Sequence, residues 1–172
     1  MLKIAGIICV LVGCIGYGID RINKERSRIE HLREMIRIIR RIRDEISYGK
    51  YTLPEICLIL SEYCSVLYQP YFRRIYEQTS RGNGTSFERI WEQQMRLCLR
   101  NAPLSDEEKD VLENMTRNLG MQEEKLQAQS IGQSVELLAE RCKKAEDAYE
   151  NKVRMIFSVS VLTGIFLTLL LL

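Results

Sequence analysis

The sequence predicts an all-α protein, a helical bundle with an apolar segment at each end. Apolar residues recur at helical spacing along most of the chain, three Ser/Thr-x-x-Glu capping boxes mark helix starts, and no stretch alternates long enough to form a strand. We therefore divide the chain into an N-terminal segment, 1–19, a central helical bundle domain, 20–154, and a C-terminal segment, 155–172.

Both terminal segments have the composition of transmembrane helices. Residues 4–19 and 155–172 carry no charged side chain, and a span needs roughly 20 mostly apolar residues. Positive residues stay on the cytoplasmic side of a span. We therefore expect a cell-membrane protein with two spans and a cytoplasmic central domain, flanked on the inside by the basic residues Arg21, Lys24, Arg26, Arg28, Lys152 and Arg154.

One alternative for the N-terminal segment is a lipoprotein signal. Residues 11–14, Leu-Val-Gly-Cys, resemble the lipobox at which bacterial lipoproteins are cleaved and acylated on cysteine. A lipoprotein anchored at Cys14 would have to export the basic cluster that follows its anchor. We therefore expect the segment to be retained, with the lipobox-processed form as the alternative.

The first helix of the domain is predicted over 20–47. Apolar residues recur at heptad spacing, and Gly49 can adopt the left-handed conformation that ends a helix. His31 falls at an outward position of this seam, where we expect a solvated surface histidine. The apolar positions of the seam are 22, 29, 32, 36, 39 and 46.

The middle helices follow from their start and stop signals. Capping boxes at 52–55, 85–88 and 105–108 open helices over about 53–66, 86–101 and 106–119. A further helix is predicted over about 69–80, before an Arg-Gly-Asn-Gly turn. Gly120 ends the helix that begins at Asp106, and Trp91 is expected to anchor the core.

The last helix is the longest. Apolar and small residues at 128, 131, 135, 138, 142, 145 and 149 step by three and four alternately, and neither Pro nor Gly occurs between 133 and 163. This pattern predicts one helix over 121–172. We expect its seam to pack antiparallel against the seam of the first helix.

The motifs of several large enzyme classes are absent from the sequence. It contains no G-x-x-x-x-G-K, H-E-x-x-H or G-x-S-x-G, and its single histidine and scattered cysteines do not make a zinc constellation. We therefore expect no enzyme activity, catalytic residue, cofactor, metal or small-molecule substrate. Attraction to anionic lipid explains the basic run 21–43 at least as well as nucleic acid does, so we expect a membrane and no nucleic-acid partner. Four cysteines are expected to be small buried hydrophobic residues: Cys57, Cys64, Cys98 and Cys142.

An acidic segment supplies the candidate partner-binding residues. Residues 104–124 hold seven acids against one Lys and one Arg. Acids in the first turn of a helix stabilise its N-terminus, which is one interpretation of the segment. The other is a negative patch that meets a basic partner. The acids beyond the first turn distinguish the two, and the candidates are Asp110, Glu113, Glu123 and Glu124.

Several stretches together resemble a known family. They are EISYGKYTLPE at 45–55, FERIW at 87–91, LSDEEKDVL at 104–112, NLG at 118–120 and the leucine-rich end. Their order and spacing resemble the stage III sporulation protein AB family of endospore-forming bacteria, over essentially the whole chain. Met121-Gln122 and Ala128-Gln129 depart from the acidic residue and Gly-Gln pair usual in that family.

The resemblance implies a role. The family is similar to the cytoplasmic F-domain of type II secretion and type IV pilus platform proteins. It implies a non-enzymatic integral membrane platform in a channel complex between mother cell and forespore, with the domain on the mother-cell side. The implied partners are a cytosolic secretion-type ATPase and other channel-complex proteins, and the chain is compatible with a homo-oligomer. A generic membrane-anchored helical tether or lipid-surface scaffold is the alternative.

Overall fold

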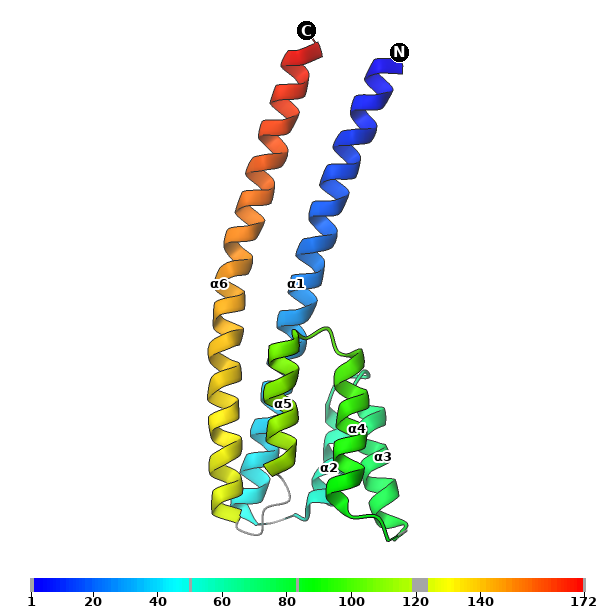
Figure 1. The fold of residues 1–172 in the computed structure, drawn as a ribbon, viewed down its shortest axis with the longest axis vertical. Helices are drawn as coiled ribbons and strands as arrows, with labels where there is room; N and C mark the ends of the chain where they lie inside the picture. Colours follow the sequence, from blue (N-terminus) through cyan, green and yellow to red (C-terminus); the bar gives the residue numbers. More distant parts are fainter. Residues whose placement is uncertain (1, 50, 83, 119–123, 172) are drawn as a thin grey trace. The chain divides into compact units, whose positions relative to one another are not determined.

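The computed structural model describes an all-α chain (Figure 1). It describes the backbone of residues 2–49, 51–82, 84–118 and 124–171, and the side chains of 12–13, 15–49, 51–82, 84–115, 128–159, 162–163 and 166. Within these ranges there are six helices and no strand, so the predicted fold class is confirmed. The helices are α1 (Leu2–Tyr48), α2 (Leu53–Tyr63), α3 (Gln69–Ser80), α4 (Phe87–Asn101), α5 (Asp106–Asn118) and α6 (Glu124–Leu171).

The expectation of two transmembrane spans is wrong. Among the residues that the structure describes, no helix has a stretch that is both long enough and apolar enough to cross a membrane. This finding overturns the assignment of 1–19 and 155–172 as spans, and with it the localisation of the chain in a cell membrane with a cytoplasmic domain between two spans.

Two of the three predicted capping boxes are formed. At α2 the backbone N–H of Thr52 donates to Glu55 Oε2 at 2.7 Å. At α5 the bonds are reciprocal: Ser105 N donates to Glu108 Oε2 at 2.8 Å, and Glu108 N donates to Ser105 Oγ at 3.3 Å. These side chains satisfy N–H groups that the first turn of a helix leaves without an intrahelical partner.

The third predicted box, at 85–88, is not formed. The N-cap of α4 is Ser86 and not the preceding threonine, and no side chain caps the helix. Glu88, the last residue of the predicted box pattern, is exposed. A helix does form here, as predicted, but the predicted capping box does not. The helix begins one residue later than the pattern requires, and this shift removes the geometry of a capping box.

Helix ends follow backbone signals where the structure describes them. Gly49 has a φ of 59°, the left-handed conformation expected after α1, and its N–H donates to Glu45 O at 3.1 Å. α2 ends at Tyr63, earlier than expected, because Cys64 is extended. The glycines of the predicted turn, Gly82 and Gly84, have φ values of 62° and 71°. Gly120 lies outside the described residues.

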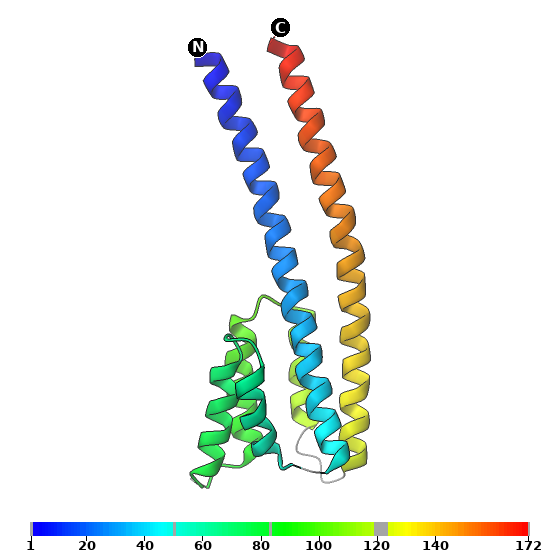
Figure 2. The same cartoon turned by 180° about the vertical axis from the view of Figure 1, so that it is seen from behind.

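The chain divides into two compact units, which we describe separately: Glu30–Cys142, and Met1–Ile29 together with Lys143–Leu172. In the first unit, α2 packs against α3, α3 against α4, and α4 against α5. Figures 1 and 2 both draw α2, α3 and α4 side by side. The parts of α1 and α6 in this unit add their apolar seams to its core.

The core of the 30–142 unit centres on aromatic residues of α3 and α4. Tyr68, Phe72 and Trp91 are at most 1% exposed, and the ring centroids of Phe72 and Trp91 lie 6.1 Å apart. Aromatic side chains bury about 150–250 Å² each and dominate the energetics of such cores. The expected role of Trp91 as a core anchor is confirmed. The four domain cysteines are also buried and unpaired by disulfides, as predicted.

The two predicted seams are buried where they fall in this unit. On α1, Leu32, Ile36 and Ile39 are at most 6% exposed, and on α6 Ile131 and Leu138 are fully buried. Periodicity identified these positions because a helix turns each of them to the same side.

Candidate functional site

The acidic surface of α5 is smaller than the sequence suggests. Asp106 and Asp110 are exposed, lie one helical turn apart, and form no ion pair with any described residue. Glu113 is half-buried and takes part in an interaction. Of the other two predicted partner-binding residues, Glu123 lies outside the described residues and Glu124 begins α6 with its side chain not described. Of the four predicted partner-binding residues, the structure therefore places Asp110 on the exposed surface of α5 and Glu113 partly on that surface.

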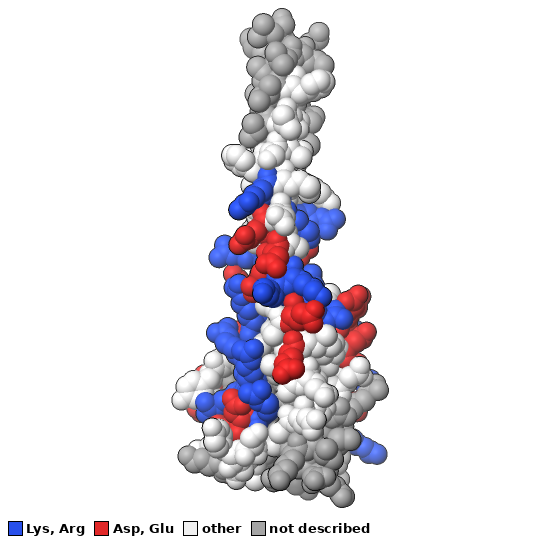
Figure 3. All heavy atoms as spheres, turned by 90° about the vertical axis from the view of Figure 1, so that its left-hand side faces the viewer, with Lys and Arg blue, Asp and Glu red and all other residues white. Residues whose placement is uncertain are grey.

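Two neighbouring acids of α5 serve the fold. Glu107 pairs with Arg141 of α6. Glu108 is fully buried and completes the capping box with Ser105. The interpretation of these acids as helix-terminal residues is therefore right for Glu108, whereas Asp106, also in the first turn, remains exposed. On the face drawn in Figure 3, basic side chains gather in a column along one side and acidic ones lie mostly beside it.

The predicted flanking basic residues lie in the second unit, on α1 and α6. Lys24 pairs with Asp20 at 2.7 Å, and Arg21 donates to Tyr17 Oη at 3.3 Å. Arg26 and Arg154 are exposed. The remaining two, Arg28 and Lys152, meet at one carboxylate.

That carboxylate is Glu25, which joins α1 to α6. Lys152 Nζ lies 2.8 Å from Glu25 Oε1, and Arg28 lies 3.4 Å from Glu25 Oε2. The hydrogen bond from Lys152 is the main reason that the pKa of Glu25 is below its ordinary value. The helices also approach closely at Gly18, where an added Cβ would lie 2.9 Å from Ile156 Cγ2. One of the basic residues that the sequence assigned to the membrane flanks, Lys152, thus links α6 to α1.

His31 is not the solvated histidine that we expected. It is half-buried, and its Nδ1 lies 3.0 Å from Tyr68 Oη. The two rings meet edge to face with centroids 5.7 Å apart. Tyr68 is fully buried, and this burial raises the pKa of its hydroxyl. His31 therefore supplies a hydrogen-bond partner to a buried tyrosine, which accounts for its place without any catalytic role.

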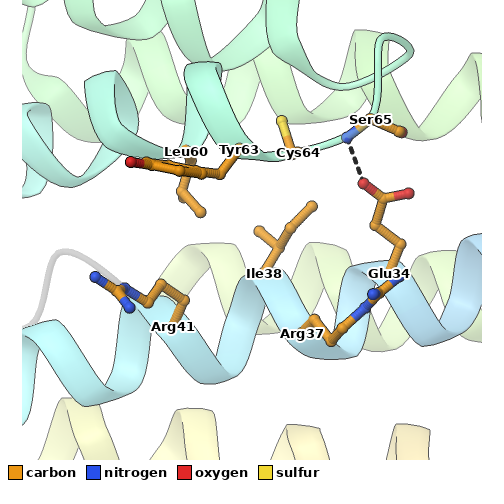
Figure 4. Close-up of a pocket in the computed structure, with 8 residues that line it drawn as sticks. All are labelled: Glu34, Arg37, Ile38, Arg41, Leu60, Tyr63, Cys64 and Ser65. Carbon is orange, nitrogen blue, oxygen red and sulfur yellow. Dashed lines mark hydrogen bonds between the residues drawn. The ribbon is translucent and has the colours of Figure 1, made fainter.

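A groove runs between α1 and α2, and we call it the α1–α2 groove. Its first hollow has a volume of about 400 Å³, and Figure 4 shows α1 and the end of α2 forming opposite walls. A second hollow of about 610 Å³ shares Arg41, Leu60 and Tyr63 with the first. The first is lined by Glu34, Arg37, Ile38, Arg41, Leu60, Tyr63, Cys64 and Ser65, and the second adds Tyr51, Ile59 and Glu62.

Some polar groups of the groove have a hydrogen-bond or ion-pair partner, and one hydroxyl does not. Ser65 N donates to Glu34 Oε1 at 2.5 Å, the contact marked in Figure 4. Arg41 pairs with Glu45 at 2.7 Å. Ser65 Oγ is shielded from solvent and has no hydrogen-bond partner among the described residues. Burial raises the pKa of Cys64 to about 11, so its thiol stays protonated at neutral pH.

No clear signal in the sequence pointed to this groove. One wall is the side of α1 that faces away from its apolar seam, and the other is the end of α2. No sequence motif links these two walls. One weak signal was available: Arg37 and Tyr63 are large side chains at outward positions next to apolar seams. The groove itself depends on the early end of α2.

Among the described residues, no group of three or more His, Cys, Asp or Glu side chains is placed to hold a metal ion.

Comparisons with known proteins agree on one family. The family model described as stage III sporulation protein AB matches residues 3–172. Stage III sporulation protein AB of Bacillus subtilis (strain 168) is 23% identical over 171 residues, which are 99% of this chain and 99% of that protein. A solved structure of stage III sporulation protein AB has the same fold, with a TM-score of 0.65 and 21% identity over 72% of this chain and 97% of that chain. Because the family model covers nearly every residue, the chain belongs to the stage III sporulation protein AB family.

Proposed function

We propose that this chain acts in stage III of endospore formation as a non-enzymatic component of a protein complex. The observation that carries the proposal is the family match over residues 3–172. The structure supports a role as a folded helical component, because buried apolar residues and structural hydrogen bonds account for the fold of its described part. Such a chain works through its surfaces.

The test of this role is genetic. In an endospore-forming host, deletion of the gene should arrest spore formation after engulfment begins, and the full chain supplied in trans should restore heat-resistant spores. A chain with its core disrupted should fail to restore them. Normal sporulation of the deletion strain would refute the role.

The finer proposal is that the complex spans from mother cell to forespore and that this chain engages a cytosolic secretion-type ATPase. The resemblance to secretion platform F-domains motivates the partner. The exposed acids of α5 offer it a surface, because Asp106 and Asp110 have no ion-pair partner among the described residues. Charges at the rim of an interface mainly set the association rate and its dependence on salt.

A matched pair of variants tests the ATPase contact. Asp110→Asn with Glu113→Gln removes two negative charges three residues apart on α5. Asp147→Asn with Glu150→Gln removes the same charges at the same spacing on exposed α6 residues. Binding to a secretion-type ATPase encoded beside this gene, measured by surface plasmon resonance, should weaken several-fold and lose salt sensitivity in the α5 variant only. Equal binding by both variants would place the contact elsewhere.

A further inference from the structure

The α1–α2 groove has the features of a protein-binding surface, and the proposed contact with an ATPase does not use it. Its rim is aromatic: Tyr63 is 82% exposed and Tyr51 is 37% exposed. Val66, just beyond the groove, is 81% exposed. Tyrosine is enriched at interfaces because it supplies a large, rigid contact area while losing little conformational freedom.

The α1 wall of the groove carries a positive charge that has no ion-pair partner among the described residues. Arg37 is exposed and forms no ion pair with any described residue, whereas its neighbour Arg41 is held by Glu45. The carboxylate of Glu34 accepts the hydrogen bond from Ser65 N and forms no ion pair with Arg37. Figure 4 shows both residues on the α1 side, with Glu34 pointing toward the end of α2 and Arg37 lying along α1.

The floor of the groove is apolar, and next to it lies one hydroxyl without a hydrogen-bond partner among the described residues. Ile38 and Leu60 line it from opposite walls, and both are at most 5% exposed. Ser65 lines the same hollow, and its Oγ has no hydrogen-bond partner among the described residues. A buried hydroxyl without a hydrogen-bond partner costs free energy, so an occupant that hydrogen-bonds to Ser65 would bind more tightly. A hollow of about 400 Å³ is within the range of clefts that enclose a ligand group.

We propose that the α1–α2 groove docks a protein segment in which an acidic residue lies beside an aromatic or large aliphatic one. The carboxylate pairs with Arg37, and the apolar side chain enters the hollow between Ile38 and Leu60 and packs against Tyr63. Glu62 lines the second hollow and would repel an acid there, so it fixes the direction of the segment. The sign of this surface is opposite to that of the acidic surface on α5, so the two select different partners.

The test uses defined probes and the full chain. A short fluorescein-labelled peptide that combines Glu and Phe is compared with its Gln-for-Glu and Ala-for-Phe counterparts by fluorescence anisotropy. We expect the parent peptide to bind, and both counterparts to bind about tenfold more weakly, because a charge-assisted hydrogen bond or a buried aromatic side chain each contributes enough for that factor. No binding of the parent peptide, or equal binding of all three, would overturn the proposal.

Variants locate the site. Arg37→Gln and Tyr63→Ser change exposed side chains, so the fold should be retained, and each should weaken binding of the parent peptide about tenfold. Arg74→Gln removes the same charge from an exposed position on α3 and should leave binding unchanged. An equal loss with Arg74→Gln would show that only net charge matters, and the groove would be excluded.

A second copy of the chain is the competing occupant. Sedimentation velocity of the full chain at increasing concentration decides this point. Self-association that Arg37→Glu abolishes and Arg74→Glu does not would show that the groove is an interface between copies, and it would overturn the proposal of an acidic partner segment. A concentration-independent sedimentation coefficient, together with peptide binding, supports that proposal. Neither result bears on the binding of an ATPase to α5, which its own variants test.

Discussion

Two of the predicted capping boxes share the same sequence pattern, but only one of them is formed, so the same substitution should affect stability differently in the two. Glu108 and Glu88 occupy the same position in two Ser/Thr-x-x-Glu patterns, yet only Glu108 is buried and accepts a hydrogen bond, from Ser105 N at 2.8 Å. Glu108→Ala removes that acceptor and leaves a cavity. Glu88→Ala removes an exposed side chain that caps nothing.

The expected magnitudes follow from these environments. Leaving a buried N–H without a partner costs about 1–3 kcal/mol, and the cavity adds to this. We therefore expect Glu108→Ala to lower the free energy of unfolding by about 2–3 kcal/mol, which corresponds to a fall in Tm of about 4–12 °C for a chain of this size. Exposed substitutions usually stay within about 0.5 kcal/mol, so Glu88→Ala should be nearly silent.

The assay is urea unfolding followed by far-UV circular dichroism, with hydrogen exchange at Ser105 N as a local readout. Glu108→Gln is the control for charge, because its side-chain oxygen can still accept the bond, and it should recover most of the loss. Exchange at Ser105 N should accelerate in Glu108→Ala and remain slow in Glu108→Gln. Equal destabilisation by Glu88→Ala and Glu108→Ala would refute the reasoning.

Two further predictions concern titrating groups. The pKa of Glu25 is lowered mainly by Lys152, so the stability that this pair contributes should be fully present above the ordinary glutamate pKa and lost as the pH falls through the lowered value. Because both side chains are partly exposed, Glu25→Gln should cost only about 0.2–1 kcal/mol at neutral pH, and the difference from wild type in urea midpoint should shrink in acid; an unchanged difference would contradict the pairing. Burial raises the pKa of Cys64 to about 11 and that of Cys98 to about 12, so iodoacetamide at neutral pH should modify them far more slowly in the native chain than in urea. Peptide mapping that finds native and unfolded rates equal for either thiol would show that it is not buried.

Local signals in the sequence predicted the helices well. The bounds of α3 match the expected 69–80, and those of α4 and α5 agree within a residue. Gly49 ends α1 in the left-handed conformation, and the apolar seams of α1 and α6 are buried. These features depend on residues within one or two turns of each other, so the pattern contains the information that decides them.

Composition was a poorer guide to the ends of the chain and to its charges. The uncharged runs predicted two membrane spans, which the described helices do not provide. The sequence holds seven acids in residues 104–124, but the structure buries Glu108 and pairs Glu107 with Arg141. Counts of residues do not say which side chains share a surface.

The tertiary structure alone decided the contacts between distant residues. His31 meets Tyr68 across 37 positions, and Glu34 meets Ser65 across 31. Glu34 engages the chain just beyond the point where α2 ends, three residues before the pattern predicted, and the α1–α2 groove lies there. Helix periodicity shows which way a side chain faces within its own helix, but not what another helix places opposite it. The sequence by itself therefore determined the helices and their apolar faces, and the packing of one helix against another determined which of the remaining polar side chains are available to a partner.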